Sequence, residues 1–317
     1  MFRYLIRRIL IMIPTLLFVI LIVLGLMNLT PGSPALIILG QDATPEMVEQ
    51  LNHELGYDRP FIVRYLHYVS NLLKGDMGKS YRTNRPVFSE IATRLPTTVK
   101  LSVSVIILVV IIAIPIGTLS AVKQYSAFDT VGTMAAMFFA CIPAFWLGLM
   151  LILVFSLKLG LLPSFGTNSW AHFILPSLTQ AIPQSARSMR LTRTTMLETI
   201  RQDYIRTARA KGQAEIKIIV QHALKNALMP IITILGVDFG FILGGTIVVE
   251  RVFSINGIGL LILDAIQVKD IPLVTGCAIV FASLYMLVLL LVDVLYALVD
   301  PRIKARYQKK SSWGGSI

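Results

Sequence analysis

Residues that could do catalytic or metal chemistry are few and widely separated in this chain. The histidines lie at positions 53, 67, 172 and 222, and both cysteines, Cys141 and Cys277, lie inside apolar runs. A zinc site needs such side chains at close spacing, and a nucleophile needs a neighbouring base. The sequence shows neither pattern and has no G-x-x-x-x-G-K-[ST] loop for nucleotide phosphates. We therefore expect no enzyme activity, no metal site and no cofactor in this chain.

One carboxylate, Asp238, stands in the middle of an apolar run. In a membrane segment an ionised carboxylate is costly, and it usually faces a bundle interior or a water-filled cavity. Two interpretations stay open. Either Asp238 faces a path for a solute, where it would favour a cationic group, or it is a buried carboxylate that is protonated or paired with a neighbour.

The composition is typical of an all-α polytopic membrane protein. Hydrophobic residues make up 55% of the 317 residues and charged residues 15%, whereas typical soluble domains carry about 25% charged residues. A spanning helix needs about 20 mostly apolar residues. Six segments meet this requirement: Ile9–Leu29, Thr98–Val122, Val131–Leu157, His172–Leu191, Leu228–Val249 and Pro272–Leu298.

The distribution of basic residues predicts the orientation of these helices. Most of the Lys and Arg residues fall near the N-terminus, between the fourth and fifth segments, and after Asp300. By the positive-inside rule these parts are cytoplasmic, as are both ends of the chain. The net charge of +12 is thereby explained without nucleic acid. The predicted layout is a transmembrane helix at 1–29, an extracytoplasmic helical insertion at 30–97, a five-helix core at 98–300 with a cytoplasmic loop at about 192–227, and a basic tail at 301–317.

The insertion at 30–97 shows the capping signals of short helices. Thr44 followed by Pro45 predicts a helix start, and Gly56 predicts its end. A second amphipathic helix is expected between Pro60 and Gly75. A third short run, from Val87 to Leu95, is expected to lead through Pro96 into the second membrane helix.

A glycine repeat marks the fifth membrane segment. Gly236, Gly240 and Gly244 recur every four residues, and Gly245 widens the same face. Such a face permits close helix packing. It is also a candidate lining for a solute path, together with Asp238, and the residues alone leave both interpretations open.

The cytoplasmic loop contains a short, sharply bounded helix. Asp203 is the expected N-cap, Tyr204 to Lys211 contains no helix breaker, and Gly212 suits the position after a helix end. A helix this short is unstable alone in water. Its exposed face is predicted to be basic, through Arg206, Arg209 and Lys211, so an acidic groove on a partner would hold it. The alternative is a positively charged loop lying on anionic lipid headgroups.

This loop resembles the hallmark of a known family. In permeases of ABC importers the loop reads E-A-A, three residues and Gly, then a spacer that ends at Pro. Here the corresponding letters are Arg206-Thr207-Ala208, Arg209-Ala210-Lys211 and Gly212, with Pro230 as the distal proline. Other segments that agree in order are "RYLIRRIL", "TPGSP", "GYDRP", "ILPSL", "KNALMP" and "VDVLYALVDPRI". The chain resembles the membrane subunit of type I importers of the dipeptide, oligopeptide and nickel class. It departs from the family pattern at Arg206, which replaces the leading Glu, and at Asn256 to Gly259, where relatives often read P-G-L-G.

The resemblance implies a role for the loop and a set of partners. Asp203, Tyr204, Arg206, Thr207, Ala208, Arg209, Ala210, Lys211 and Gly212 would form the coupling helix that enters a cleft of a cytoplasmic ATPase. The implied partners are a homologous second permease subunit in a heterodimer, two ATPase subunits that bind ATP and Mg, an extracytoplasmic substrate-binding protein, and the bilayer of the bacterial cytoplasmic membrane. Peptides are the expected cargo; glutathione, opines and nickel chelates stay open.

Two other classes of protein compete with this interpretation. A secondary transporter would show matched inverted halves, whereas here one half carries the insertion and the other carries the cytoplasmic loop. A membrane scaffold would have no use for a capped coupling segment.

Overall fold

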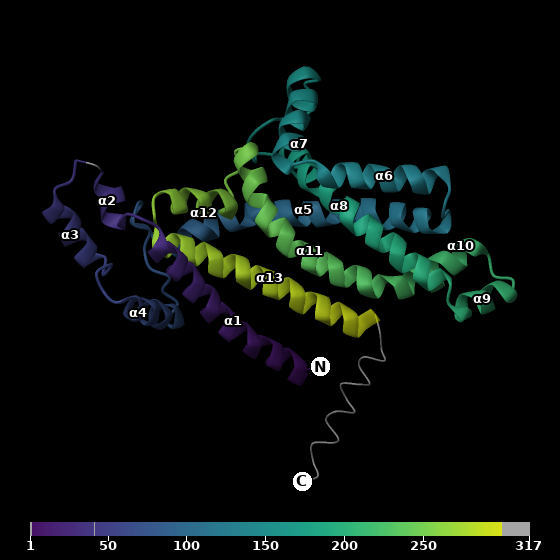
Figure 1. The fold of residues 1–317 in the computed structure, drawn as a ribbon, viewed down its shortest axis with the longest axis horizontal. Helices are drawn as coiled ribbons and strands as arrows, with labels where there is room; N and C mark the ends of the chain where they lie inside the picture. The colour runs from purple at the N-terminus through teal and green to yellow at the C-terminus, as the bar shows by residue number, and fades with distance from the viewer. Residues whose placement is uncertain (1, 41, 300–317) are drawn as a thin grey trace, which may run out of the picture. The chain divides into compact units, whose positions relative to one another are not determined.

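The computed structural model describes residues 2–40 and 42–299, so the predicted basic tail at 301–317 lies outside the described residues. Within these ranges the chain is helical (Figure 1). The α-helices are α1 (Phe2–Leu29), α2 (Pro34–Leu39), α3 (Pro45–Glu54), α4 (Phe61–Leu73), α5 (Val87–Val122), α6 (Ala127–Cys141), α7 (Ala144–Leu151), α8 (Ala171–Ile200), α9 (Asp203–Ala210), α10 (Glu215–Lys217), α11 (Lys225–Val252), α12 (Ile258–Gln267) and α13 (Ile271–Val299). Two π-helical segments, η1 (Ile152–Lys158) and η2 (Ile218–Leu224), extend α7 and precede α11.

Contacts divide the chain into two compact units. The N-terminal unit holds residues 2–98 and 256–287, and the central unit holds 99–255 and, among the described residues, 288–299. Each unit has its own apolar core. In the N-terminal unit, side chains of α1, α4, α12 and α13 pack around Val87 and Ile91 at the start of α5.

Four described helices are long and apolar enough to cross a membrane: Ile6–Leu29, Val87–Val122, Glu215–Val252 and Ile271–Leu295. A fifth crossing is present if α6 and the α7–η1 helix count as one span. The predicted segment His172–Leu191 is helical, within α8, but buried Ser, Thr and Gln side chains make α8 less apolar than these four helices. The number of spans therefore stays a prediction.

Within the predicted span Val131–Leu157 the helix is broken. The chain bends by 101° between Cys141 and Ala144. Pro143 is the reason, because proline has no amide hydrogen to donate and disfavours helical geometry in the residue before it. Ile142 has the extended angles φ −75° and ψ 124°.

The capping signals of the insertion were confirmed. The Thr44 side chain accepts a hydrogen bond from the Met47 amide at 3.4 Å. Gly56 and Gly75 follow α3 and α4 with φ of +65° and +83°, the left-handed region that favours glycine. The predicted run Val87 to Leu95 is the first part of α5, which leads through Pro96 as expected and continues to Val122.

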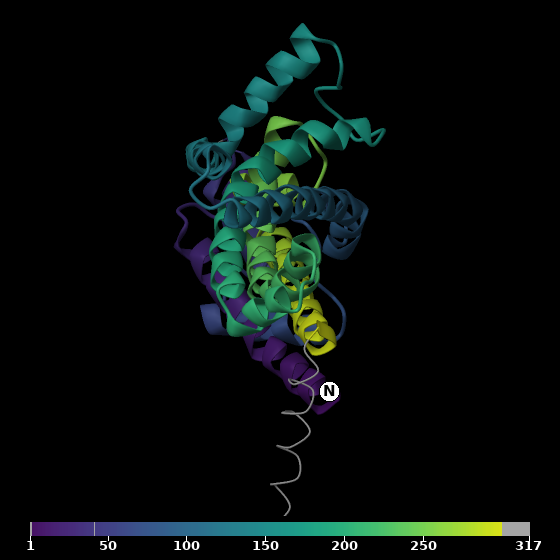
Figure 2. The same ribbon diagram turned by 90° about the vertical axis from the view of Figure 1, so that its right-hand side faces the viewer.

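Helix α8 is the centre of the central unit. It packs against α6, α7, η2 and α11, and Figures 1 and 2 show α8 and α11 running side by side. Gly117 of α5 allows a close approach to α8, because a Cβ there would lie 2.7 Å from the Met189 carbonyl oxygen. This packing positions Asp238 and the loop that follows α8.

Candidate functional site

The predicted short helix of the loop is present as α9, with a different first residue. Gln202 is the N-cap and makes no side-chain capping bond, so the assignment of Asp203 to that position was wrong. Asp203 is instead the first helical residue, where its negative charge still favours the positive end of the helix dipole. Gly212 follows the helix end with φ +73°, as predicted.

One face of α9 packs against its own chain. Ile205 is completely buried and Ala208 is 9% exposed. They join an apolar cluster with Ala121 of α5, Met196 of α8 and residues of η2 and α11. This cluster stabilises a helix too short to persist alone, so the chain itself provides part of the support that the sequence assigned to a partner.

The outer face of α9 is less basic than the sequence suggests. Arg209 donates two hydrogen bonds to Glu215, at 3.1 and 2.6 Å, and the Glu215 carboxylate raises the pKa of Arg209. Arg206 lies 3.8 Å from Asp203. Tyr204, Thr207, Ala210 and Lys211 are also exposed. The surface open to a partner is therefore mixed polar and aromatic, with its charges largely balanced.

An ion pair that the sequence did not predict joins α6 to α8. Arg193 Nε donates to Asp129 Oδ1 at 2.5 Å, and Arg193 Nη2 donates to Oδ2 at 2.7 Å. The same carboxylate accepts the Tyr125 amide at 3.0 Å, which holds Tyr125 at φ +63° in the α5–α6 turn. Arg193 lies two turns before α8 ends, so the pair fixes this turn to the segment that leads into α9. Spacing gives no signal for it, because 64 residues separate the partners.

Asp238 is completely buried in the middle of α11. Its Oδ2 accepts a hydrogen bond from Ser188 Oγ at 2.8 Å, and its Oδ1 lies 3.7 Å from Arg187 Nη1. Both partners belong to α8. This geometry matches the second interpretation of the sequence, a carboxylate paired with a neighbour. Arg187 was not singled out from the sequence. An arginine inside a predicted span, here His172–Leu191, is nevertheless unusual enough to mark a candidate functional residue.

The glycines of α11 lie in different surroundings. A Cβ at Gly236 would lie 2.7 Å from Val292 Cγ2 of α13, and one at Gly245 would lie 2.4 Å from Gln180 Nε2 of α8. Gly244 is exposed, and a Cβ there would meet nothing within 4 Å. Gly240 is partly exposed. One end of the repeat therefore serves packing, and the other end lies on an open face.

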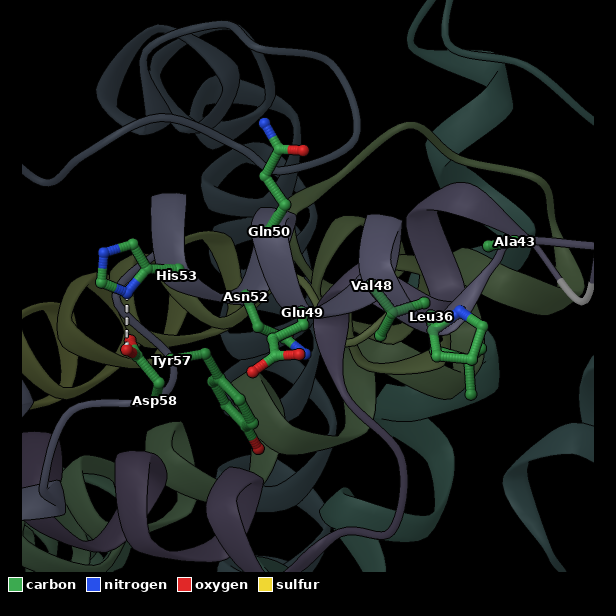
Figure 3. A pocket seen from close by; sticks show the side chains of 10 residues that line it. Leu36, Ala43, Val48, Glu49, Gln50, Asn52, His53, Tyr57 and Asp58 are labelled. Carbon is green, nitrogen blue, oxygen red and sulfur yellow. Dashed lines mark hydrogen bonds and ion pairs between the residues drawn. The ribbon is translucent and has the colours of Figure 1, made fainter.

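The insertion contains a shallow hollow of about 770 Å³ beside α3. Figure 3 shows its lining, with His53 and Asp58 joined at its edge. His53 Nδ1 and Asp58 Oδ2 lie 2.8 Å apart, and this hydrogen bond lowers the pKa of Asp58. Both side chains are largely exposed, and among the described residues no three His, Cys, Asp or Glu side chains group as metal ligands.

Family models match nearly all of the chain. Residues 113–305 match the binding-protein-dependent transport system inner membrane component, and residues 1–102 match the N-terminal component of the same membrane proteins. Among similar curated proteins are the glutathione transport system permease proteins GsiC of Pectobacterium atrosepticum and of Escherichia coli strain K12. Each is 40% identical over 304 residues, which cover 96% of this chain and 99% of the relative.

Solved structures show the same fold. Two crystal forms of the inward-facing MetNI methionine ABC transporter match with TM-scores of 0.55 and 0.54 at 19% and 18% identity. They cover 67% and 66% of this chain, and 97% and 95% of the matched chains. The family match and the shared fold agree with the helical, membrane-embedded architecture described above. This chain therefore belongs to the family of inner membrane components of binding-protein-dependent transport systems, and it is the membrane-spanning permease subunit of a bacterial ABC importer, not the subunit that hydrolyses ATP.

Proposed function

We propose that this permease imports small peptides, with glutathione as the first cargo to test. The observation that carries the proposal is the full-length similarity to glutathione transport system permeases, at 40% identity over 96% of this chain. Glutathione is itself a tripeptide, so this cargo falls within the peptide class expected from the sequence.

The proposed assembly has two different permease subunits, this chain and a homologue, which together enclose the path. Two cytoplasmic ATPase subunits would bind ATP and Mg, and an extracytoplasmic binding protein would deliver the cargo. The family description, which names a binding protein, supports this arrangement.

The proposed coupling element is the segment Asp203–Gly212. Closure of the ATPases around ATP would push on the exposed face of α9. The buried contacts of Ile205 and Ala208 with α5, α8 and η2 would pass that displacement to the bundle. The Asp129–Arg193 pair would carry it to the α5–α6 turn as well.

The proposed path follows the open part of the α11 face. Gly244 and Gly240 expose backbone there, whereas Gly236 is occupied by packing against α13. Asp238 is on the same helix but is completely buried, beside the exposed Arg187. Its charge would therefore affect the cargo only through its effect on Arg187.

Uptake by the complete transporter tests the proposed function. We expect proteoliposomes that contain both permeases and both ATPases to accumulate labelled glutathione only with ATP and the loaded binding protein. Uptake of labelled dipeptides and of a nickel chelate is measured in parallel. Uptake of the nickel chelate with no uptake of glutathione or dipeptides would overturn the peptide assignment.

A further inference from the structure

The side chain of Arg187 lies between a buried carboxylate and an exposed ring, both on α11. Its Nη1 is 3.7 Å from Asp238 Oδ1, and its guanidinium carbon is 4.9 Å from the centre of the Phe241 ring. Asp238 is completely buried, whereas 47% of the Arg187 side chain is exposed. The charge that this part of the molecule presents outward is therefore positive.

The depth of Arg187 restricts what it can face. Asp238, its partner, is near the midpoint of the 28-residue helix α11. A half-exposed guanidinium at that depth is costly against lipid, and charged groups there face a water-filled cavity or another protein. Phe241 and Gly244 continue the same exposed face along α11. This face consequently belongs to the surface that the assembled importer keeps away from lipid.

The N–H donors of the Arg187 guanidinium are not used by other described residues. The 3.7 Å separation from Asp238 exceeds hydrogen-bond distance, and across residues 2–40 and 42–299 no acceptor takes a hydrogen bond from Arg187. A guanidinium offers five N–H donors in a planar fork that matches a carboxylate. With Asp238 behind it and the Phe241 ring beneath it, this fork is held in place before any ligand arrives.

Two amides lie on the same face of α8 as Arg187. Gln180, Gln184 and Arg187 are spaced as neighbours on one helix surface. Gln180 Nε2 donates to the Ile242 carbonyl at 2.5 Å, while Gln180 Oε1 and Gln184 Nε2 have no hydrogen-bond partner among the described residues. Both of these atoms are buried, so on this face of α8 the side chain that opens outward is Arg187.

We propose that Arg187 binds the carboxylate of the transported peptide. The inference rests on the proposed function. From the sequence, Asp238 suggested a negatively charged site for a cationic cargo group, whereas Arg187 makes the site positively charged. Asp238 is then a positioning residue that holds the arginine, and the site on this chain prefers anionic cargo groups.

A pair of cargos that differ in one charge tests this proposal. The probes are a labelled peptide with a free C-terminal carboxylate and the same peptide as its amide, chosen so that the purified binding protein holds both equally. We expect Arg187→Gln to lower kcat/KM for uptake of the acid by about tenfold, the size of a lost charge-assisted hydrogen bond, with little change for the amide. Arg187→Lys keeps the charge but loses the planar set of donors. Its kcat/KM for the acid should therefore lie between the values for the wild type and for Arg187→Gln. The matched control is Arg190→Gln, because Arg190 is an exposed arginine on the same helix.

A defect in folding would reduce uptake of both probes equally, so the ratio of acid to amide uptake is the informative measurement. An unchanged ratio in both Arg187 variants overturns the proposal. A wild-type complex that takes up neither peptide refutes the proposed function itself, which separates the two failures.

A contact measurement serves as a second test that does not depend on the binding protein's selectivity. A benzophenone amino acid at Val237, which is 37% exposed and one turn from Phe241, should crosslink to labelled glutathione in the nucleotide-free complex. We expect Arg187→Gln to weaken this crosslink and Arg190→Gln to leave it intact. Equal crosslinking in all three proteins would contradict a carboxylate site at Arg187.

Discussion

At the scale of single residues, identical residue types take different roles according to what packs against them. Gly236 and Gly244 belong to one four-residue repeat, yet the first lies against Val292 and the second faces open space. The carboxylates differ in the same way. Asp238 is completely buried against α8, whereas Asp58 is solvent-exposed in the insertion.

The two glycines give a matched pair of variants. We expect Gly236→Ala to destabilise the permease by roughly 1–3 kcal/mol, because the new methyl group overpacks a filled contact. Gly244→Ala should leave the thermal unfolding midpoint of the purified transporter unchanged, since its Cβ would meet nothing. Equal losses in the two variants would show that the whole repeat is a packing surface in the assembly.

At the scale of elements, α9 is a two-sided helix. Its inner side chains, Ile205 and Ala208, belong to the apolar core of the central unit, and Thr207 points away from it. Helix α8 leads directly into α9 and is fixed to the α5–α6 turn by the Asp129–Arg193 pair. Helix α9 contacts η2, and its two buried side chains share one apolar cluster with residues of α5, α8 and α11.

Crosslinking tests which side of α9 meets the ATPase. In a background with Cys141 and Cys277 replaced by Ser, we expect Thr207→Cys to crosslink to cysteines introduced along the ATPase cleft. Ala208→Cys should not, because that position is 9% exposed and covered by its own chain. Crosslinks from position 208 but not from 207 would refute the arrangement of α9 described here.

At the scale of the whole molecule, the family match covers residues 1–102 and 113–305, almost the entire chain. The basic residues predict that both ends and α9 are cytoplasmic and that α3 is outside. Long apolar helices flank the insertion, Ile6–Leu29 before it and Val87–Val122 after it, and a third, Glu215–Val252, follows α9.

Reporter fusions test this topology. Alkaline phosphatase, which is active only outside the cytoplasm, should be active when fused after Gln50 and inactive when fused after Gln213. A fluorescent protein that folds only in the cytoplasm should show the opposite pattern. The reverse result at both positions would invert the predicted orientation.

Local chemistry determined much of the helical plan in advance. Thr44 and Pro45 predicted the start of α3, and Gly212 predicted the end of α9. Caps, glycine conformations and apolar periodicity involve residues within a turn of one another, so they can be read from the sequence. The general character of the chain, a helical membrane protein without a nucleotide-binding loop, was set by composition and motif for the same reason.

Tertiary structure alone decided which distant side chains meet. Ser188 is 50 residues from Asp238, and Arg193 is 64 from Asp129. No periodicity connects such pairs, because helix packing brings them together. The sequence identified Asp238 as an unusual charge, but only the fold showed that α8 buries it and leaves Arg187 exposed. The angle of the bend at Pro143 was also decided by the tertiary structure. A proline in a membrane helix permits a break, but the surrounding packing determines its angle.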